Sequence, residues 1–145
     1  MKTLIVPVND PGEAEAAVRR AVDAHRRDAA PVHLLNVQRP LPMHIAQFFD
    51  REELAQVHRE AGMRVLERAA RLLEDAHVPY EAHVLVGKPA ETIVSFAEQH
   101  PGADLLMDTA APGLLSRLGI GSIGSQVRHL LEAHGGGAAP EASAR

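Results

Sequence analysis

Residues 119–124, Gly-Ile-Gly-Ser-Ile-Gly, are the stretch of this sequence whose residue types and spacing could bind a phosphate. Their spacing matches the glycine-rich turn of dinucleotide-binding proteins, but that turn follows a strand directly, and here a loop of about a dozen residues precedes it. What remains is a predicted helix start at Gly121 and Ser122, where backbone N–H groups and the positive end of the helix dipole could hold an anion. A capped helix without a ligand explains the same residues equally well.

The nine histidines and the serines form no recognisable catalytic or metal-binding pattern. No His-Glu-x-x-His or comparable ligand spacing is present, so we predict no metal site. His33 and His83 fall within predicted strands, where a structural role is expected. No serine lies in a Gly-x-Ser-x-Gly elbow, and the absence of cysteine excludes disulfides, thiolate zinc sites and a cysteine nucleophile. With no catalytic constellation, the sequence favours a binding protein over an enzyme.

Length and charge narrow the function further. The chain has 145 residues, with 15 basic against 19 acidic side chains and a net charge of -4. A chain of this length buries roughly 70% of the surface that its unfolded form exposes, enough for one domain with a single core. Its longest apolar run, residues 4–8, is far shorter than the ~18 residues needed to cross a membrane, and it carries no secretory signal, so a cytoplasmic protein without a membrane partner is expected. The acidic balance and the scarcity of aromatic residues argue against nucleic acid as a partner.

The elements that must position these residues alternate between strand and helix. Apolar runs predict strands, and apolar residues at a period of 3.6 predict amphipathic helices, the longest of them capped by Asp50. Pro7 is placed near the end of the first strand, because proline cannot donate to a sheet ladder. The predicted strands are residues 4–8, 32–37, 80–86 and 103–107, and the predicted helices are residues 12–28, 51–77, 89–100 and a last one from residue 121.

This order predicts an α/β fold: a doubly wound, open parallel sheet of four strands with helices on both faces. Ligands of such sheets bind outside the carboxyl ends of the strands. A surface loop is expected between the second strand and the long helix. Three glycines at 135–137 end the last helix, so the predicted domain is residues 1–134, and residues 135–145 are expected to form a disordered tail.

Five stretches of the chain together resemble the universal stress protein family. They are residues 4–9, 32–37, 87–93, 102–107 and 121–123, and their order and spacing in a chain of this length are quite specific. The resemblance covers residues 2 to about 134. It implies a single Rossmann-like domain of the adenine nucleotide alpha hydrolase-like kind, with five strands, commonly dimeric and in one branch able to bind ATP.

The family's nucleotide signature is Gly-x-x-Gly, nine residues, and then Gly-Ser or Gly-Thr. On this chain the signature begins at Asp108, continues at Ala111 and ends at Gly121 and Ser122 with the nine-residue gap intact, so two of its glycines are replaced. The acidic residue that usually closes the first strand is Asn9 here. The resemblance implies that the other pocket positions match acceptably, at Pro7, Val8, Val37, Met107 and Ile123. The frame of the pocket is therefore kept and the phosphate cradle is damaged.

The two replaced glycines favour weak or absent ATP binding. At about 5 Å and an effective dielectric of about 20, the repulsion between Asp108 and one phosphate charge costs roughly 3 kcal/mol, about two powers of ten in affinity. Ala111 adds a methyl group where the backbone should approach the phosphates. The alternative is that Asp108 holds a Mg²⁺ that bridges the phosphates, giving an ATP-binding switch or slow ATPase that uses Gly121 and Ser122. No general base for hydrolysis is evident.

The family's fifth strand has no counterpart after the last predicted helix, where small and polar residues follow. In the family that strand lies at the edge of the sheet and often forms the dimer contact. Its loss would expose residues 105–107, and an uncovered apolar edge invites pairing with another chain. We therefore expect a homo-oligomer or a complex with another universal stress-type protein. The most favoured function is a regulatory or interaction module in stress response, and a sheet-edge interaction protein is a further alternative.

Overall fold

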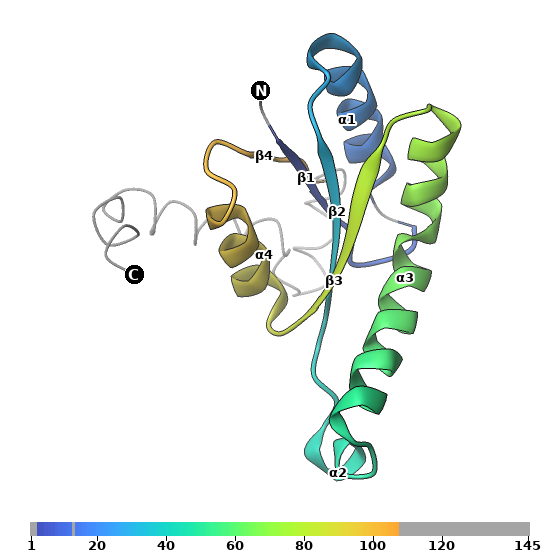
Figure 1. The fold of residues 1–145 in the computed structure, drawn as a ribbon, viewed down its shortest axis with the longest axis vertical. Coiled ribbons are helices and arrows are strands. Elements are labelled where there is room, and N and C mark those ends of the chain that lie inside the picture. The colour runs from blue at the N-terminus through green and yellow to red at the C-terminus, as the bar shows by residue number, and fades with distance from the viewer. Residues whose placement is uncertain (1–2, 13, 108–145) are drawn as a thin grey trace, which may run out of the picture.

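The computed structural model describes residues 3–12 and 14–107, and within them strands and helices alternate as predicted (Figure 1). Four strands form one sheet in the order β3-β2-β1-β4, and every neighbouring pair is parallel. The fold is therefore an open, parallel α/β sheet, which confirms the predicted class. The elements are β1 (Leu4–Pro7), α1 (Glu15–Asp28), β2 (Val32–Gln38), α2 (Met43–Ala46), α3 (Arg51–Asp75), β3 (Tyr80–Val86), α4 (Pro89–Glu98) and β4 (Asp104–Leu105).

Helices cover both faces of the sheet, and the side chains of each strand alternate between them. In Figure 1, α1 and α3 lie on one side of the sheet and α4 lies on the other. Leu34 packs in the core beneath α1 and α3, whereas Leu35 packs in the core beneath α4, and both side chains are fully buried. Two apolar cores thus enclose the central strands, which explains why β1 and β2 are apolar at nearly every position.

Pro7 is the last residue of β1, as its missing N–H requires. On one side of β1, the N–H of Leu4 donates to Pro31 and the N–H of Val8 donates to Leu35 on β2. The backbone N–H groups of the even-numbered residues of β1 therefore point toward β2, and the backbone nitrogen of the odd-numbered Pro7 points toward β4. The N–H of Leu106 donates to the carbonyl of Ile5, and Pro7 cannot supply the next bond in that ladder. This accounts for the two-residue length of β4.

The long helix α3 is fixed at its start and at its middle. Asp50 accepts a hydrogen bond of 2.8 Å from the N–H of Glu53, whose side chain in turn accepts one of 2.9 Å from the N–H of Asp50. This capping box confirms the predicted cap. Farther along, Gly62 lies directly on the sheet: a Cβ there would come within 2.6 Å of Cγ2 of Val84 and 3.0 Å of Oδ1 of Asn36. Only glycine allows α3 to approach this closely.

Several boundaries differ from the sequence predictions. The first helix begins at Glu15 rather than at residue 12, and the long helix ends at Asp75 rather than at residue 77. The fourth strand is Asp104–Leu105 rather than residues 103–107, because Pro7 has no N–H to continue the ladder between β1 and β4. The loop after β2 contains the short helix α2, which begins after Pro42 and buries none of its residues. A single turn without a buried face leaves no periodicity in the sequence to predict it.

Three predictions concern residues outside the described part of the chain. These are the helix from residue 121, the absence of a fifth strand and the tail at residues 135–145. Among the described residues, no helix combines the length and the apolar character that crossing a membrane requires.

Candidate functional site

The candidate site lies at the carboxyl ends of the strands, where β1 has a neighbour on either side. Pro7, Val8 and Asn9 lie at or directly after the end of β1, and Val37 is the penultimate residue of β2. Met107 follows β4, the neighbour of β1 on the other side. Because the strands are parallel, these five predicted residues lie along one edge of the sheet.

This edge offers mainly apolar side chains. Val37 and Met107 both belong to the core beneath α4, with Val37 6% exposed and Met107 half-buried. Val8 belongs to the opposite core and is buried, while Asn9 is half-buried. Of these five residues, Asn9 and Met107 are the partly exposed ones, while Pro7, Val8 and Val37 are buried.

A buried amide holds the edge together. Asn36 on β2 is 1% exposed, and its Nδ2 donates a hydrogen bond of 2.8 Å to the carbonyl oxygen of Val8. Its Oδ1 accepts a hydrogen bond of 2.7 Å from Nε2 of Gln38. Asn36 thus fixes the chain directly before Asn9. Sequence reasoning did not single out this residue, although an amide within the apolar run of residues 32–37 was the available signal.

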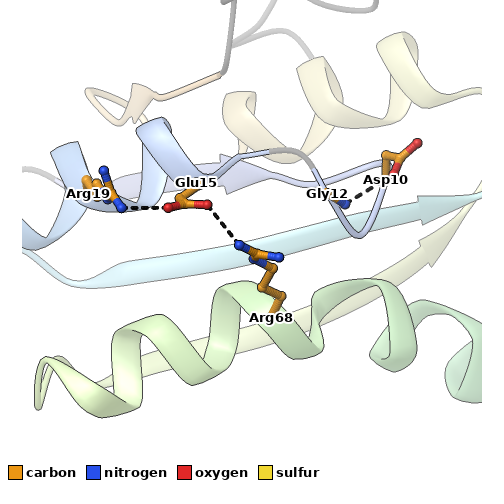
Figure 2. Close-up of polar contacts among 5 residues, drawn as sticks. All are labelled: Asp10, Gly12, Glu15, Arg19 and Arg68. Atoms are coloured by element: carbon orange, nitrogen blue, oxygen red, sulfur yellow. Dashed lines mark hydrogen bonds and ion pairs between the residues drawn. The ribbon is translucent and has the colours of Figure 1, made fainter.

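Among the described residues, Asp10 in the loop after β1 and Glu15 at the start of α1 both use their carboxylates in polar contacts (Figure 2). Oδ1 of Asp10 accepts a hydrogen bond of 3.1 Å from the N–H of Gly12. Glu15, in the first turn of α1, contacts Arg19 at 2.6 Å and Arg68 of α3 at 3.1 Å. A carboxylate at the positive end of a helix already satisfies the helix dipole. At the start of α1, Glu15 thus accepts from both arginines and links α1 to α3.

The segment that leaves β4 is tied to α1. Nη2 of Arg20 donates a hydrogen bond of 2.9 Å to the carbonyl oxygen of Met107. This contact fixes the last described residue before Asp108. The remaining predicted site residues, Asp108, Ala111, Gly121, Ser122 and Ile123, lie outside the residues that the structure describes.

A second group of polar side chains lies at the opposite, amino end of the strands. Nδ1 of His33 on β2 is 2.9 Å from Nε2 of His83 on β3, and Oε1 of Glu81 lies 4.0 Å and 3.7 Å from these two nitrogens. Burial, followed by the neighbouring His83, lowers the pKa of His33 below its ordinary value of 6.5. The structural role expected for the two histidines is consistent with their direct contact. The grouping with Glu81 was missed, because its members come from two strands whose adjacency the sequence did not reveal.

An open groove of about 550 Å³ lies between α3 and β3. It is separate from both groups, since it contains none of the predicted site residues and neither His33 nor His83. Its lining residues are Ala55, His58, Arg59, Met63, Ala82, Val84 and Val86.

Comparisons with known proteins agree with this architecture. Residues 1–132 match the model of the Universal stress protein family. Universal stress protein MJ0531 of Methanocaldococcus jannaschii is 24% identical over 127 residues, which cover 87% of this chain and 75% of that protein.

Solved structures show the same fold. The structure of hypothetical protein MJ0577 is 25% identical, covers 89% of this chain and 90% of its own, and superposes with a TM-score of 0.67. A universal stress protein solved in complex with cAMP is 19% identical, covers 88% of this chain and 90% of its own, and has a TM-score of 0.66.

Proposed function

The chain belongs to the universal stress protein family, and on that premise we propose that it is a cytoplasmic regulatory or interaction module of the stress response that binds ATP weakly or not at all. It acts by binding and not by turnover. Fold alone does not fix function, so the proposal depends on the carboxyl edge of the sheet and on the residues that the sequence places next to it.

The proposal rests on one contrast. The carboxyl edge of the sheet is held by hydrogen bonds, whereas two glycines of the phosphate motif are replaced. Pro7, Val8, Val37 and Met107 lie along the edge, held by the hydrogen bonds of Asn36 and Arg20. The sequence then continues with Asp108 and Ala111, where the family signature has glycines. The edge supports contacts with a nucleoside, whereas a carboxylate beside the phosphates opposes each negative charge that the ligand brings.

The repulsion from Asp108 should depend on how many phosphates a nucleotide carries. A monophosphate brings less negative charge to Asp108 than a triphosphate does, so the penalty falls mainly on ATP. The similar protein solved with cAMP binds a nucleotide with a single phosphate group. We accordingly expect AMP to lose less affinity from Asp108 than ATP does.

Calorimetric titration of the full chain with MgATP and with AMP tests the proposal. The Asp108→Asn variant should bind MgATP more tightly than the native chain, by up to about two powers of ten. Asp28→Asn is the matched control, because Asp28 lies at the far end of α1 and is exposed. Micromolar binding of MgATP by the native chain would overturn the assignment of weak ATP binding.

A nucleotide switch is the second candidate, favoured by the retained Gly121 and Ser122 at the family spacing. In this case Asp108 would hold a Mg²⁺ that bridges the phosphates. The same variant separates the two functions by sign, because Asp108→Asn should then weaken MgATP binding. Ser122→Ala should weaken it as well, and unchanged binding in both variants would eliminate the switch.

Pairing through the sheet edge is a third candidate. In the described part of the sheet, β4 is the outermost strand beside β1. Leu105, Leu106 and Met107 are each only half-buried there. Size-exclusion chromatography with light scattering measures the outcome directly. A monomer at high protein concentration would argue against edge pairing and against the expected homo-oligomer.

A further inference from the structure

Strand register brings three metal-ligating side chains together at the amino end of the sheet. In the β2–β3 ladder His33 lies opposite Glu81, and Leu35 lies opposite His83. Glu81 and His83 are two residues apart, so their side chains point to the same face of β3. That face is the one covered by α4, since His33 and His83 both contact the ring of Phe96.

The spacing of the donor atoms fits a transition-metal ion. The three separations are 2.9 Å between the two imidazole nitrogens, 3.7 Å from His83 to Glu81 and 4.0 Å from His33 to Glu81. A tetrahedral zinc ion with bonds of about 2.0–2.1 Å requires its ligand atoms to lie about 3.3 Å apart. Each observed separation is within about 0.7 Å of that value, which small side-chain rotations can supply.

From this geometry we propose that His33, Glu81 and His83 bind a divalent transition-metal ion such as Zn²⁺. Two imidazoles and one carboxylate are the donor set that zinc and its neighbours accept, whereas Mg²⁺ and Ca²⁺ require oxygen ligands. The negative charge of Glu81 offsets half of the charge of the ion. A metal would bind at the opposite end of the strands from the candidate nucleotide site.

The three side chains differ in exposure, so the proposed site has a buried side and a side open to solvent. The side chain of His33 is 12% exposed and that of His83 is 27% exposed, while that of Glu81 is 73% exposed. The imidazoles therefore form the inner part of the site, and the carboxylate closes it from the solvent side. β3 is an outer strand of the described sheet, so solvent reaches the site from that flank.

Aromatic rings from α4 and the turn after it complete the wall. The ring of Phe96 lies 4.9 Å from that of His83, and the ring of His100 lies 5.0 Å from that of His33. Nδ1 of His100 is 3.0 Å from the carbonyl oxygen of Phe96. A carbonyl only accepts, so Nδ1 donates this hydrogen bond and the ring is held in place. The two rings pack against the imidazoles of His83 and His33.

A direct hydrogen bond between the two histidines is the competing explanation. It accounts for the 2.9 Å separation of the imidazole nitrogens. It leaves Glu81 at 3.7 Å and 4.0 Å from the two nitrogens, which is ion-pair distance and too long for hydrogen bonds. A cation between the three side chains would replace the bond between the imidazoles and bring Glu81 into direct contact, so metal titration separates the two explanations.

The test uses the full chain without an affinity tag, treated with a chelator and then titrated with Zn²⁺ in a calorimeter. We expect one Zn²⁺ per chain at this site. Titration with Co²⁺ should give the visible absorption of a tetrahedral ion. Replacing ligands should weaken Zn²⁺ binding at least about tenfold in the double variant Glu81→Gln/His83→Gln.

A matched double variant, His44→Gln/Glu52→Gln, removes one exposed histidine and one exposed glutamate elsewhere and should bind as the native chain does. The single variant Glu81→Gln changes a largely exposed side chain, so folding is preserved, and it should also weaken binding. Thermal unfolding of each metal-free variant checks this. No binding by the native chain, or equal affinity in the two double variants, would overturn the proposal.

Discussion

Nδ2 of Asn36 and the carbonyl oxygen of Val8 are joined by a hydrogen bond of 2.8 Å in the interior of the protein. This bond links the loop that follows β1 to the neighbouring strand β2. It therefore sets the position of the carboxyl edge at which we place the nucleotide.

Replacing this amide should destabilise the whole domain. In Asn36→Leu the buried carbonyl of Val8 loses its partner, which costs about 1–3 kcal/mol of the free energy of unfolding. Chemical denaturation measures the loss. Gln47→Leu is the control, because the Gln47 amide bonds to the carbonyl of His44 in the same way at an exposed position. That variant should change the free energy by no more than about 0.5 kcal/mol.

A methyl group at Gly62 should destabilise the protein although alanine favours helices. The added Cβ would come within 2.6 Å of Cγ2 of Val84, and overpacking of this kind costs about 1–3 kcal/mol. Denaturation of Gly62→Ala tests the direction. Adding Val84→Ala makes room for the methyl group, so the double variant should lose less than the sum of the single losses. Additive losses would show that Val84 is not the obstacle.

Alkaline pH should act on stability through Tyr80. Its hydroxyl donates a hydrogen bond of 2.6 Å to Glu74, and this bond, followed by burial, raises the pKa of Tyr80 to about 12. The folded state thus disfavours the ionised phenol, so the stabilisation is complete below pH 10 and is lost as the pH rises from about 10 to about 12.

Two measurements check this prediction. Tyr80 is the single tyrosine of the chain, so the ultraviolet absorbance of tyrosinate reports its pKa directly. Tyr80→Phe has no phenol to ionise and should lose less stability over the same pH range. A pKa near 10 for Tyr80 in the folded protein would contradict the prediction.

The ion pairs of Glu15 should contribute little. Arg68 bridges α3 to Glu15 at 3.1 Å, but the Arg68 side chain is 64% exposed (Figure 2). Exposed pairs contribute at most about 1 kcal/mol, and salt screens them. Arg68→Gln should therefore cost less than that, and the difference from the native chain should vanish in concentrated salt. A larger, salt-independent loss would indicate that Arg68 stabilises the fold through packing.

The sequence predicted the elements whose patterns are set by burial. β3 was predicted with the bounds Tyr80–Val86 that the structure has, and Asp50 was correctly chosen as the cap of α3. Both signals are local: alternation along a strand and a short polar side chain before an amphipathic run. The length of β4 was wrong because it depends on Pro7 of a neighbouring strand.

What the sequence could not supply was adjacency between distant residues. His33 and Glu81 are far apart in the chain, and only the β2–β3 register places them opposite each other. Asn36 was overlooked for a similar reason, since its partner Val8 lies directly after another strand, β1. Spacing rules detect ligands that share a helix or a loop, and they miss ligands that share only a sheet.

The placement of Pro7 has a mechanical consequence. After the bond from the N–H of Leu106 to Ile5, the next backbone hydrogen bond between β1 and β4 would have to be donated by Pro7, which has no N–H. Within the described residues, the two strands therefore lack the main-chain bond that another residue at position 7 would donate. On the other side of β1, separation from β2 at the same level would require breaking the bond from the N–H of Val8 to Leu35, so the two sides of this strand differ in mechanical strength.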